Sequence, residues 1–146
     1  MNAHSSPSTA AEAIDILIVT AIKEEWDELL QVTDGAVGPW EPAIGPHNLQ
    51  VARTRFRAKD GSVLRVLATW ALEMGGVAAS NAAGPLVERY HPRVLAMCGV
   101  CAGRRGKVNL GDVLVADRLW FYDVGKTTVE YPAGVERRVF EGSMHQ

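Results

Sequence analysis

The feature that most constrains the fold is a near-continuous apolar run from Ile14 to Thr20, which reads IDILIVT and is rich in β-branched residues. A strand with one face in water alternates apolar and polar side chains, whereas this run is apolar on both faces. Helix formers follow from Lys23 to Val32, with Trp26, Leu29 and Leu30 at helical spacing. The pattern predicts a buried strand, a short turn and a helix, which is how an α/β sheet begins.

The rest of the chain continues this alternation of strands and helices. Glycine and proline are too frequent in residues 35–48 for a regular element, so a loop is expected there. Residues 49–58 and 63–70 are predicted to form a hairpin, because the Asp60-Gly61 pair between them suits a tight turn. A second helix and two more strands are predicted at residues 76–90, 94–97 and 112–121.

These elements predict an α/β fold with a mixed, largely parallel sheet and helices on both faces. Residues 14–20 and 94–97 are expected to be neighbouring central strands, because both are apolar on both faces. Residues 1–13 are expected to be a flexible tail, since they have neither the basic start nor the apolar core of a secretory signal.

The composition excludes several classes of function. A net charge of -2 gives no electrostatic reason to bind nucleic acid or an anionic membrane. No apolar run approaches the ~20 residues of a membrane span, so no membrane partner is expected. The chain has 2 cysteines, too few for a disulfide framework, and a cytoplasmic location is therefore expected.

Several cofactor and metal motifs were tested by their spacing. The first strand is not followed by a glycine-rich turn, and neither Gly-Lys pair completes a phosphate-binding loop, so no nucleotide cofactor is expected. Cys98-Gly99-Val100-Cys101 is formally a redox pair or half a zinc site. No second ligand pair accompanies it, which favours two packed small residues and no metal.

Arg53, Arg55 and Arg57 alternate along one strand and so share one face of it. This face is either an anion site or, as we favour, a solvated basic surface.

Two carboxylates lie where the first strand meets the first helix. Glu24 and Glu25 would be at the carboxyl edge of the sheet, where α/β proteins usually bind ligands. A carboxylate there can orient a water molecule or bind a sugar hydroxyl. Acidic residues in a first helical turn also stabilise the helix dipole, and the local pattern alone leaves both interpretations open.

Three segments in order give a more specific indication: TAIKEEWDELL, EMGGVAASNAAGPLVERYHPRVLAMCGVCAG and KVNLGDVLVADRLWFYD. Together they resemble the N-terminal half of the nucleoside phosphorylase and nucleosidase superfamily, above all its methylthioadenosine/S-adenosylhomocysteine nucleosidase branch. The resemblance implies that Glu25 is the catalytic glutamate that helps to position the attacking water. It implies that the substrate is bound by two residues after the first strand and a loop near residue 100, namely Ala21, Ile22, Gly99, Val100, Cys101 and Ala102.

The activity implied by this resemblance is cleavage of the N-glycosidic bond of a purine nucleoside or nucleotide. Hydrolysis is favoured over phosphorolysis, because Thr20-Ala21 does not resemble the phosphate-binding arrangement of the phosphorylases. The resemblance also implies a homo-oligomer if the domain is complete. A non-catalytic nucleoside-sensing or interaction module, as in bacterial signalling or defence proteins, is the alternative.

The resemblance also sets an expectation for the extent of the domain. The family carries the acid that protonates the departing purine in a C-terminal half, which would begin after about residue 146. Residues 14–146 are therefore expected to be the N-terminal part of such a domain, and the isolated chain is expected to have little or no nucleosidase activity.

Overall fold

The computed structural model describes residues 13–117, 125–131, 134 and 137–142, which form two compact units, Met1–Ala102 and Gly103–Gln146. The expected tail lies outside the described residues apart from its last position, Ala13. None of the described helices is long and apolar enough to cross a membrane.

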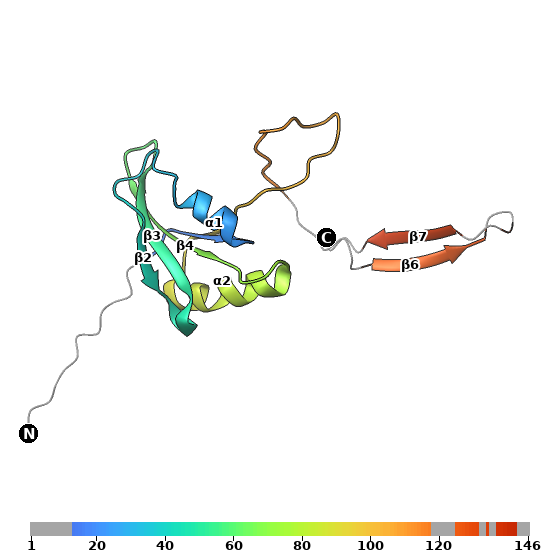
Figure 1. Cartoon of the computed structure of the whole chain (residues 1–146), viewed down its shortest axis with the longest axis horizontal. Helices are drawn as coiled ribbons and strands as arrows, with labels where there is room; N and C mark the ends of the chain where they lie inside the picture. Colours follow the sequence, from blue (N-terminus) through green and yellow to red (C-terminus); the bar gives the residue numbers. More distant parts are fainter. Residues whose placement is uncertain (1–12, 118–124, 132–133, 135–136, 143–146) are drawn as a thin grey trace, which may run out of the picture. The chain divides into compact units, whose positions relative to one another are not determined.

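The first unit contains a five-stranded mixed sheet, as expected (Figure 1). Its strand order is β2-β3-β4-β1-β5; β1 runs parallel to β4 and β5, while β2 with β3 and β3 with β4 are antiparallel. In chain order its elements are β1 (Ile16–Thr20), α1 (Lys23–Leu29), β2 (Glu41–Ile44), the short 3-10 helix η1 (Pro46–Asn48), β3 (Gln50–Arg57), β4 (Val63–Trp70), α2 (Gly76–Tyr90) and β5 (Val94–Met97).

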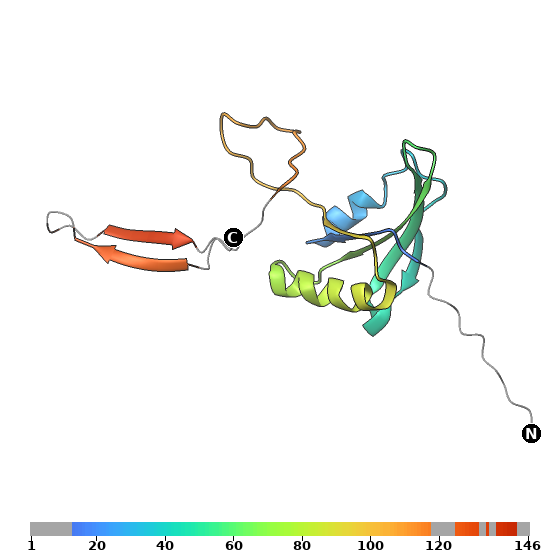
Figure 2. The ribbon, with the colours of Figure 1, turned by 180° about the vertical axis from the view of Figure 1, so that it is seen from behind.

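The two helices cover opposite faces of this sheet. Consecutive side chains of β1 point to opposite faces, so each face packs against a different helix. Leu17 and Leu67 are fully buried on one face with Leu86 of α2. Ile18 and the buried Trp26 of α1 belong to the cluster on the other face. Figure 2 shows α1 (blue) and α2 (yellow-green) on opposite sides of the sheet from behind. The prediction of helices on both faces is thus confirmed.

The hairpin, the second helix and the adjacency of β1 and β5 are confirmed too. The hairpin of β3 and β4 turns at Gly61, whose φ of 85° is readily adopted by glycine, and Asp60 accepts the Ser62 backbone N–H at 2.9 Å. Strand β1 pairs directly with β5, Leu17 lying opposite Leu95.

Three sequence-based expectations were wrong. Residues 35–48 contain strand β2, which pairs with β3; the strand tolerates Pro42 because it lies at the sheet edge, where fewer ladder bonds are needed. Strand β5 is also at an edge of the described sheet and leaves Met97 62% exposed, so it is not central. Residues 112–117 are irregular, with Val115 90% exposed, because no neighbouring strand pairs with them among the described residues; residues 118–121 of that expected strand lie outside the described part.

The second unit contains a two-stranded antiparallel hairpin that the sequence pattern did not indicate. Strands β6 (Gly125–Glu130) and β7 (Arg137–Gly142) pair along their whole length. Neither strand has the long apolar run that identified β1.

Candidate functional site

The candidate site lies where β1 and β5 end side by side. These neighbouring parallel strands place their following loops together at the carboxyl edge of the sheet, the usual ligand-binding position of α/β folds. The pairing extends one residue beyond β5, since the Cys98 backbone N–H donates to the Val19 carbonyl at 3.0 Å. The turn that starts α1 and the loop after β5 are thereby held next to each other.

Glu25 joins these two segments. One carboxylate oxygen, Oε2, accepts a hydrogen bond from the Ala21 backbone N–H at 3.0 Å, four residues earlier in the chain. The other, Oε1, accepts the Val100 backbone N–H at 2.8 Å, from 75 residues away. The first contact is the local, helix-start role that the sequence left open, and the second ties α1 to the loop after β5.

Glycine at position 99 allows this close approach. A Cβ atom built there would lie 2.5 Å from Oε1 of Glu25 and 2.8 Å from its Cδ, distances that real Cβ contacts do not show. The φ angle of Gly99 is not in the left-handed region, so the constraint at this position is the space taken by the Glu25 carboxylate, which is the end of a flexible side chain and would have to shift. The Glu25 carboxylate therefore occupies the space that a side chain at position 99 would need.

The surroundings of Glu25 favour its charged form. The hydrogen bond from Val100 lowers the pKa of this carboxyl most, burial opposes that effect, and hydrogen bonds from the Ala21 and Ile22 backbones lower the pKa further. The net result is a pKa below the ordinary value of 4.5. Glu25 is thus an ionised acceptor at neutral pH.

An open depression of about 550 Å³ adjoins this carboxylate. Its lining in the described part of the chain includes three carboxylates and neither lysine nor arginine: Ile22, Glu24, Glu25, Glu28, Leu29, Val32, Cys98, Gly99 and Val100. Glu28, Leu29 and Val32 were not among the residues predicted from sequence. Glu28 and Leu29 follow Glu25 by three and four residues, and this spacing is the signal that could have found them, because such residues share one helix face. Val32 lies beyond the end of α1.

The structure brings together four of the six predicted substrate-binding residues. Ala21 and Val100 bind Glu25, while Ile22 and Gly99 line the depression beside it. Cys101 and Ala102 follow in the same loop and are exposed, but they are not part of this lining. The roles of all six residues as substrate ligands stay predictions.

The expectation of packed cysteines was wrong. Cys98 and Cys101 are both exposed free thiols, because they follow β5, which is an edge strand of the described sheet. Within the described ranges, no group of three or more His, Cys, Asp or Glu residues is placed to hold a metal ion.

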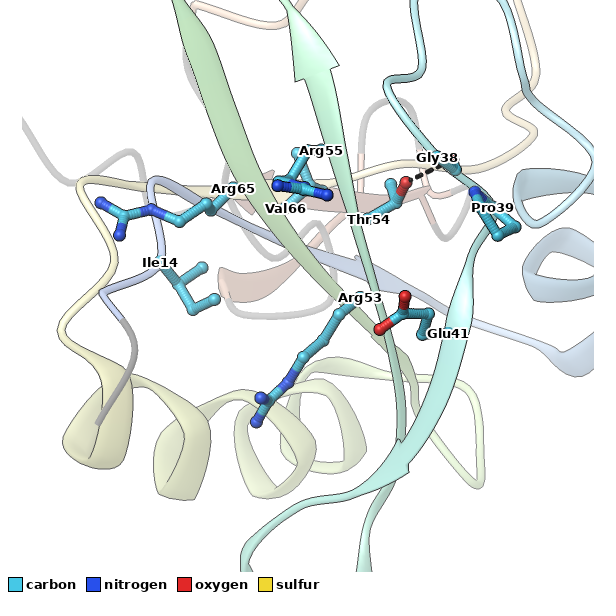
Figure 3. A pocket seen from close by; sticks show the side chains of 9 residues that line it. All are labelled: Ile14, Gly38, Pro39, Glu41, Arg53, Thr54, Arg55, Arg65 and Val66. Carbon is cyan, nitrogen blue, oxygen red and sulfur yellow. Dashed lines mark hydrogen bonds between the residues drawn. The ribbon is translucent and has the colours of Figure 1, made fainter. Parts of the chain in front are cut away.

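A second depression, of about 260 Å³, is lined by Arg53 and Arg55 of the basic strand face and by Arg65 of β4, and not by Glu25. Arg55 and Arg57 are exposed, whereas Arg53 is half-buried and donates to the Tyr90 hydroxyl of α2 at 2.9 Å. Figure 3 shows the Arg53 side chain running toward α2 and the Arg65 side chain pointing elsewhere. Arg65 instead pairs with Asp15 at 3.6 Å. The two guanidinium groups do not converge on one anion.

Comparisons with known proteins place the chain in a family. The family model of the phosphorylase superfamily matches residues 15–145. An uncharacterized protein, y4jS of Sinorhizobium fredii, is 31% identical over 117 residues, which cover 78% of this chain and 27% of that protein. The ATP nucleosidase Cap17 of Escherichia coli strain KTE188 is 29% identical over 108 residues, covering 74% of this chain and 21% of that protein. No solved structure matches the chain at a significant level.

The matched region is a small part of these relatives. It spans 27% of the Sinorhizobium protein and 21% of the Escherichia coli nucleosidase, so each has most of its length outside the region shared with this chain.

Proposed function

Because this chain belongs to the phosphorylase superfamily, we propose that it forms part of a domain that cleaves the N-glycosidic bond of a purine nucleoside or nucleotide, with water as the acceptor. The observation that carries the proposal is the carboxylate of Glu25, which bridges the Ala21 and Val100 backbones at the ligand-binding edge of the sheet. The likeness to a protein described as an ATP nucleosidase supports the reaction class.

Cleavage of the glycosidic bond requires a group that orients the attacking water, and Glu25 is placed to do this. Cleavage passes through an oxocarbenium-like sugar, so a group must hold water against the anomeric carbon while the base departs. An ionised carboxylate has about four acceptor positions, and the Ala21, Ile22 and Val100 backbones use up to three of those of Glu25. The position that remains can accept a hydrogen bond from the attacking water. The negative charge also favours the positive charge that develops on the sugar.

The charges around the depression favour water over phosphate as the nucleophile. Inorganic phosphate is an anion, and the described lining contributes the carboxylates of Glu24, Glu25 and Glu28 without a guanidinium or ammonium group. Like charges raise the cost of placing phosphate there. Water has no such penalty.

A two-part experiment tests the proposal. Nucleoside binding is measured first on the chain itself, by NMR, using methylthioadenosine and ATP; the Val100 and Ala21 amides should shift, and the Ser62 amide of the distant hairpin should not. Turnover is then measured as purine release by a chimaera, in which the chain is joined to the C-terminal half of a superfamily member that supplies the acid.

Glu25→Gln is the decisive variant of the chimaera, and Glu24→Gln is its matched control. Gln keeps the size of the side chain but removes the charge, so Glu25→Gln should lower kcat ~10²-fold or more, with little change in KM. Glu24 is exposed on α1, and among the described residues the loop after β5 donates its hydrogen bond to Glu25 and not to Glu24, so Glu24→Gln should change kcat less than about threefold. Equal losses in the two variants, or turnover that requires phosphate, would contradict the proposal.

A further inference from the structure

The two cysteines of this chain flank the residues that contact Glu25. Cys98 and Cys101 are the only thiols among the 146 residues, and both are exposed. Between them lie Gly99, against which the Glu25 carboxylate packs, and Val100, whose backbone N–H is donated to Glu25 at 2.8 Å. A chemical change at this pair therefore acts on the segment that completes the candidate site.

The backbone of this segment does not form the turn that a disulfide between residues 98 and 101 needs. A disulfide requires the two Cα atoms to approach within about 7 Å, and a four-residue segment whose ends are that close is a β-turn. Residues 98–101 instead run without a turn or a bend. Cys98 is fixed by its backbone hydrogen bond to Val19 at 3.0 Å, so closure has to move Gly99, Val100 and Cys101.

We propose that Cys98 and Cys101 are a redox pair, and that the disulfide between them and the hydrogen bond from Val100 to Glu25 exclude each other. Closing the turn reorients the peptide between Gly99 and Val100, which removes this N–H from Oε1 of Glu25. In the reduced chain, the Glu25 carboxylate accepts hydrogen bonds from the Ala21 and Val100 backbones. In the oxidised chain it keeps the hydrogen bond from Ala21, at the start of α1, and loses the one from Val100.

The chemistry is thiol–disulfide exchange with a small-molecule disulfide as the oxidant. The thiolate of one cysteine attacks one sulfur of the small disulfide, forming a mixed disulfide and releasing one small thiol. The second protein thiolate then attacks the protein sulfur of the mixed disulfide and releases the second small thiol. Two protein thiols lose two protons and two electrons, and the small disulfide gains them as two small thiols.

The test uses the 146-residue chain with oxidised glutathione, followed by dithiothreitol. Mass spectrometry and thiol titration should show a monomer that has lost two hydrogen atoms and both free thiols, without retained glutathione. The Val100 amide resonance should move on oxidation and return on reduction. The amide of Ser62, which donates to the Asp60 carboxylate at 2.9 Å on the distant hairpin, should stay in place as an internal control.

Two variants separate the disulfide from a general effect of the oxidant. Cys98→Ser and Cys101→Ser each keep the loop and one thiol, so each should retain one glutathione and leave the Val100 amide closer to its reduced position. A stable mixed disulfide in the unsubstituted chain, a disulfide between two chains, or a closed disulfide with an unmoved Val100 resonance would each overturn the inference. These readouts require no turnover, so they are independent of the proposed function.

Discussion

Replacing Gly99 by alanine tests the close packing of the loop after β5 against Glu25. The new Cβ would lie 2.5 Å from Oε1 and 2.8 Å from Oε2 of Glu25, so the carboxylate or the loop has to shift. The φ angle of Gly99 is not left-handed, and alanine therefore adds no backbone strain of its own. The expected loss of stability comes from the carboxylate contacts.

The magnitude follows from the two hydrogen bonds that the carboxylate would give up. Hydrogen bonds to charged groups contribute about 1.5–3 kcal/mol each, and we take about 1 kcal/mol here because Glu25 is only half-buried. Losing the bonds from Ala21 and Val100 then costs about 2 kcal/mol. Alanine restricts the unfolded chain, which offsets about 0.4–1 kcal/mol. The free energy of unfolding should fall by about 1–1.5 kcal/mol, the difference between these terms.

Urea unfolding followed by circular dichroism measures this change, and Gly84→Ala is its matched control. Gly84 lies inside α2 with nothing within 4 Å of its added Cβ, so alanine there should raise the free energy of unfolding by about 0.5–1 kcal/mol. The same Gly99→Ala change is then made beside Glu25→Ala, where no carboxylate remains to displace. A similar loss from Gly99→Ala with and without the Glu25 carboxylate would refute the reasoning.

Three further predictions concern acid stability, the core and the sheet edge. Because the pKa of Glu25 is below its ordinary value of 4.5 in the folded chain, folding is stabilised above that pH and the contribution is lost as the pH falls through the folded pKa; Glu25→Gln should flatten this part of a pH series of urea midpoints. Leu17→Ala removes a fully buried side chain of β1 and should lower the free energy of unfolding by about 2–5 kcal/mol; a loss below about 1 kcal/mol in the same urea assay would contradict its place in the core. Hydrogen exchange should be slow at the Val94 amide, which donates to the Asp15 carbonyl at 3.0 Å, and faster at Leu95, whose amide points to the outer side of β5; equal protection would contradict the edge position.

The sequence pattern correctly predicted the elements that are specified by neighbouring residues along the chain. The apolar run of β1, the helical spacing of α2 and the Asp60-Gly61 turn each specify one element, and the structure contains all three. The ends were less well predicted: β1 begins at Ile16 and α1 ends at Leu29, because terminal residues have fewer neighbours to fix them.

Whether a weakly patterned segment forms a strand depends on whether a neighbouring strand pairs with it, which the sequence pattern does not show. Strand β2 lies in a segment rich in glycine and proline, and it exists because β3 supplies its hydrogen bonds. Pro42 is tolerated because, in the described part of the chain, β2 has a neighbouring strand on one side only. The apolar residues 112–117 have the opposite outcome, since an apolar sequence becomes a strand only where another strand pairs with it.

The residues of the candidate site were predicted from the sequence, whereas the contacts between them were not. Glu25, Ala21 and the loop near Val100 were identified from sequence, through the order and spacing of motifs that resemble a known family. The sequence could not show that one carboxylate accepts hydrogen bonds from both segments, because the partners are 75 residues apart and meet only when β1 and β5 pair. It also could not show that the two thiols are exposed, since exposure depends on which strand lies at the edge. Residue types and local spacing follow from the chain alone, whereas contacts between distant segments follow from how the strands are ordered in the sheet.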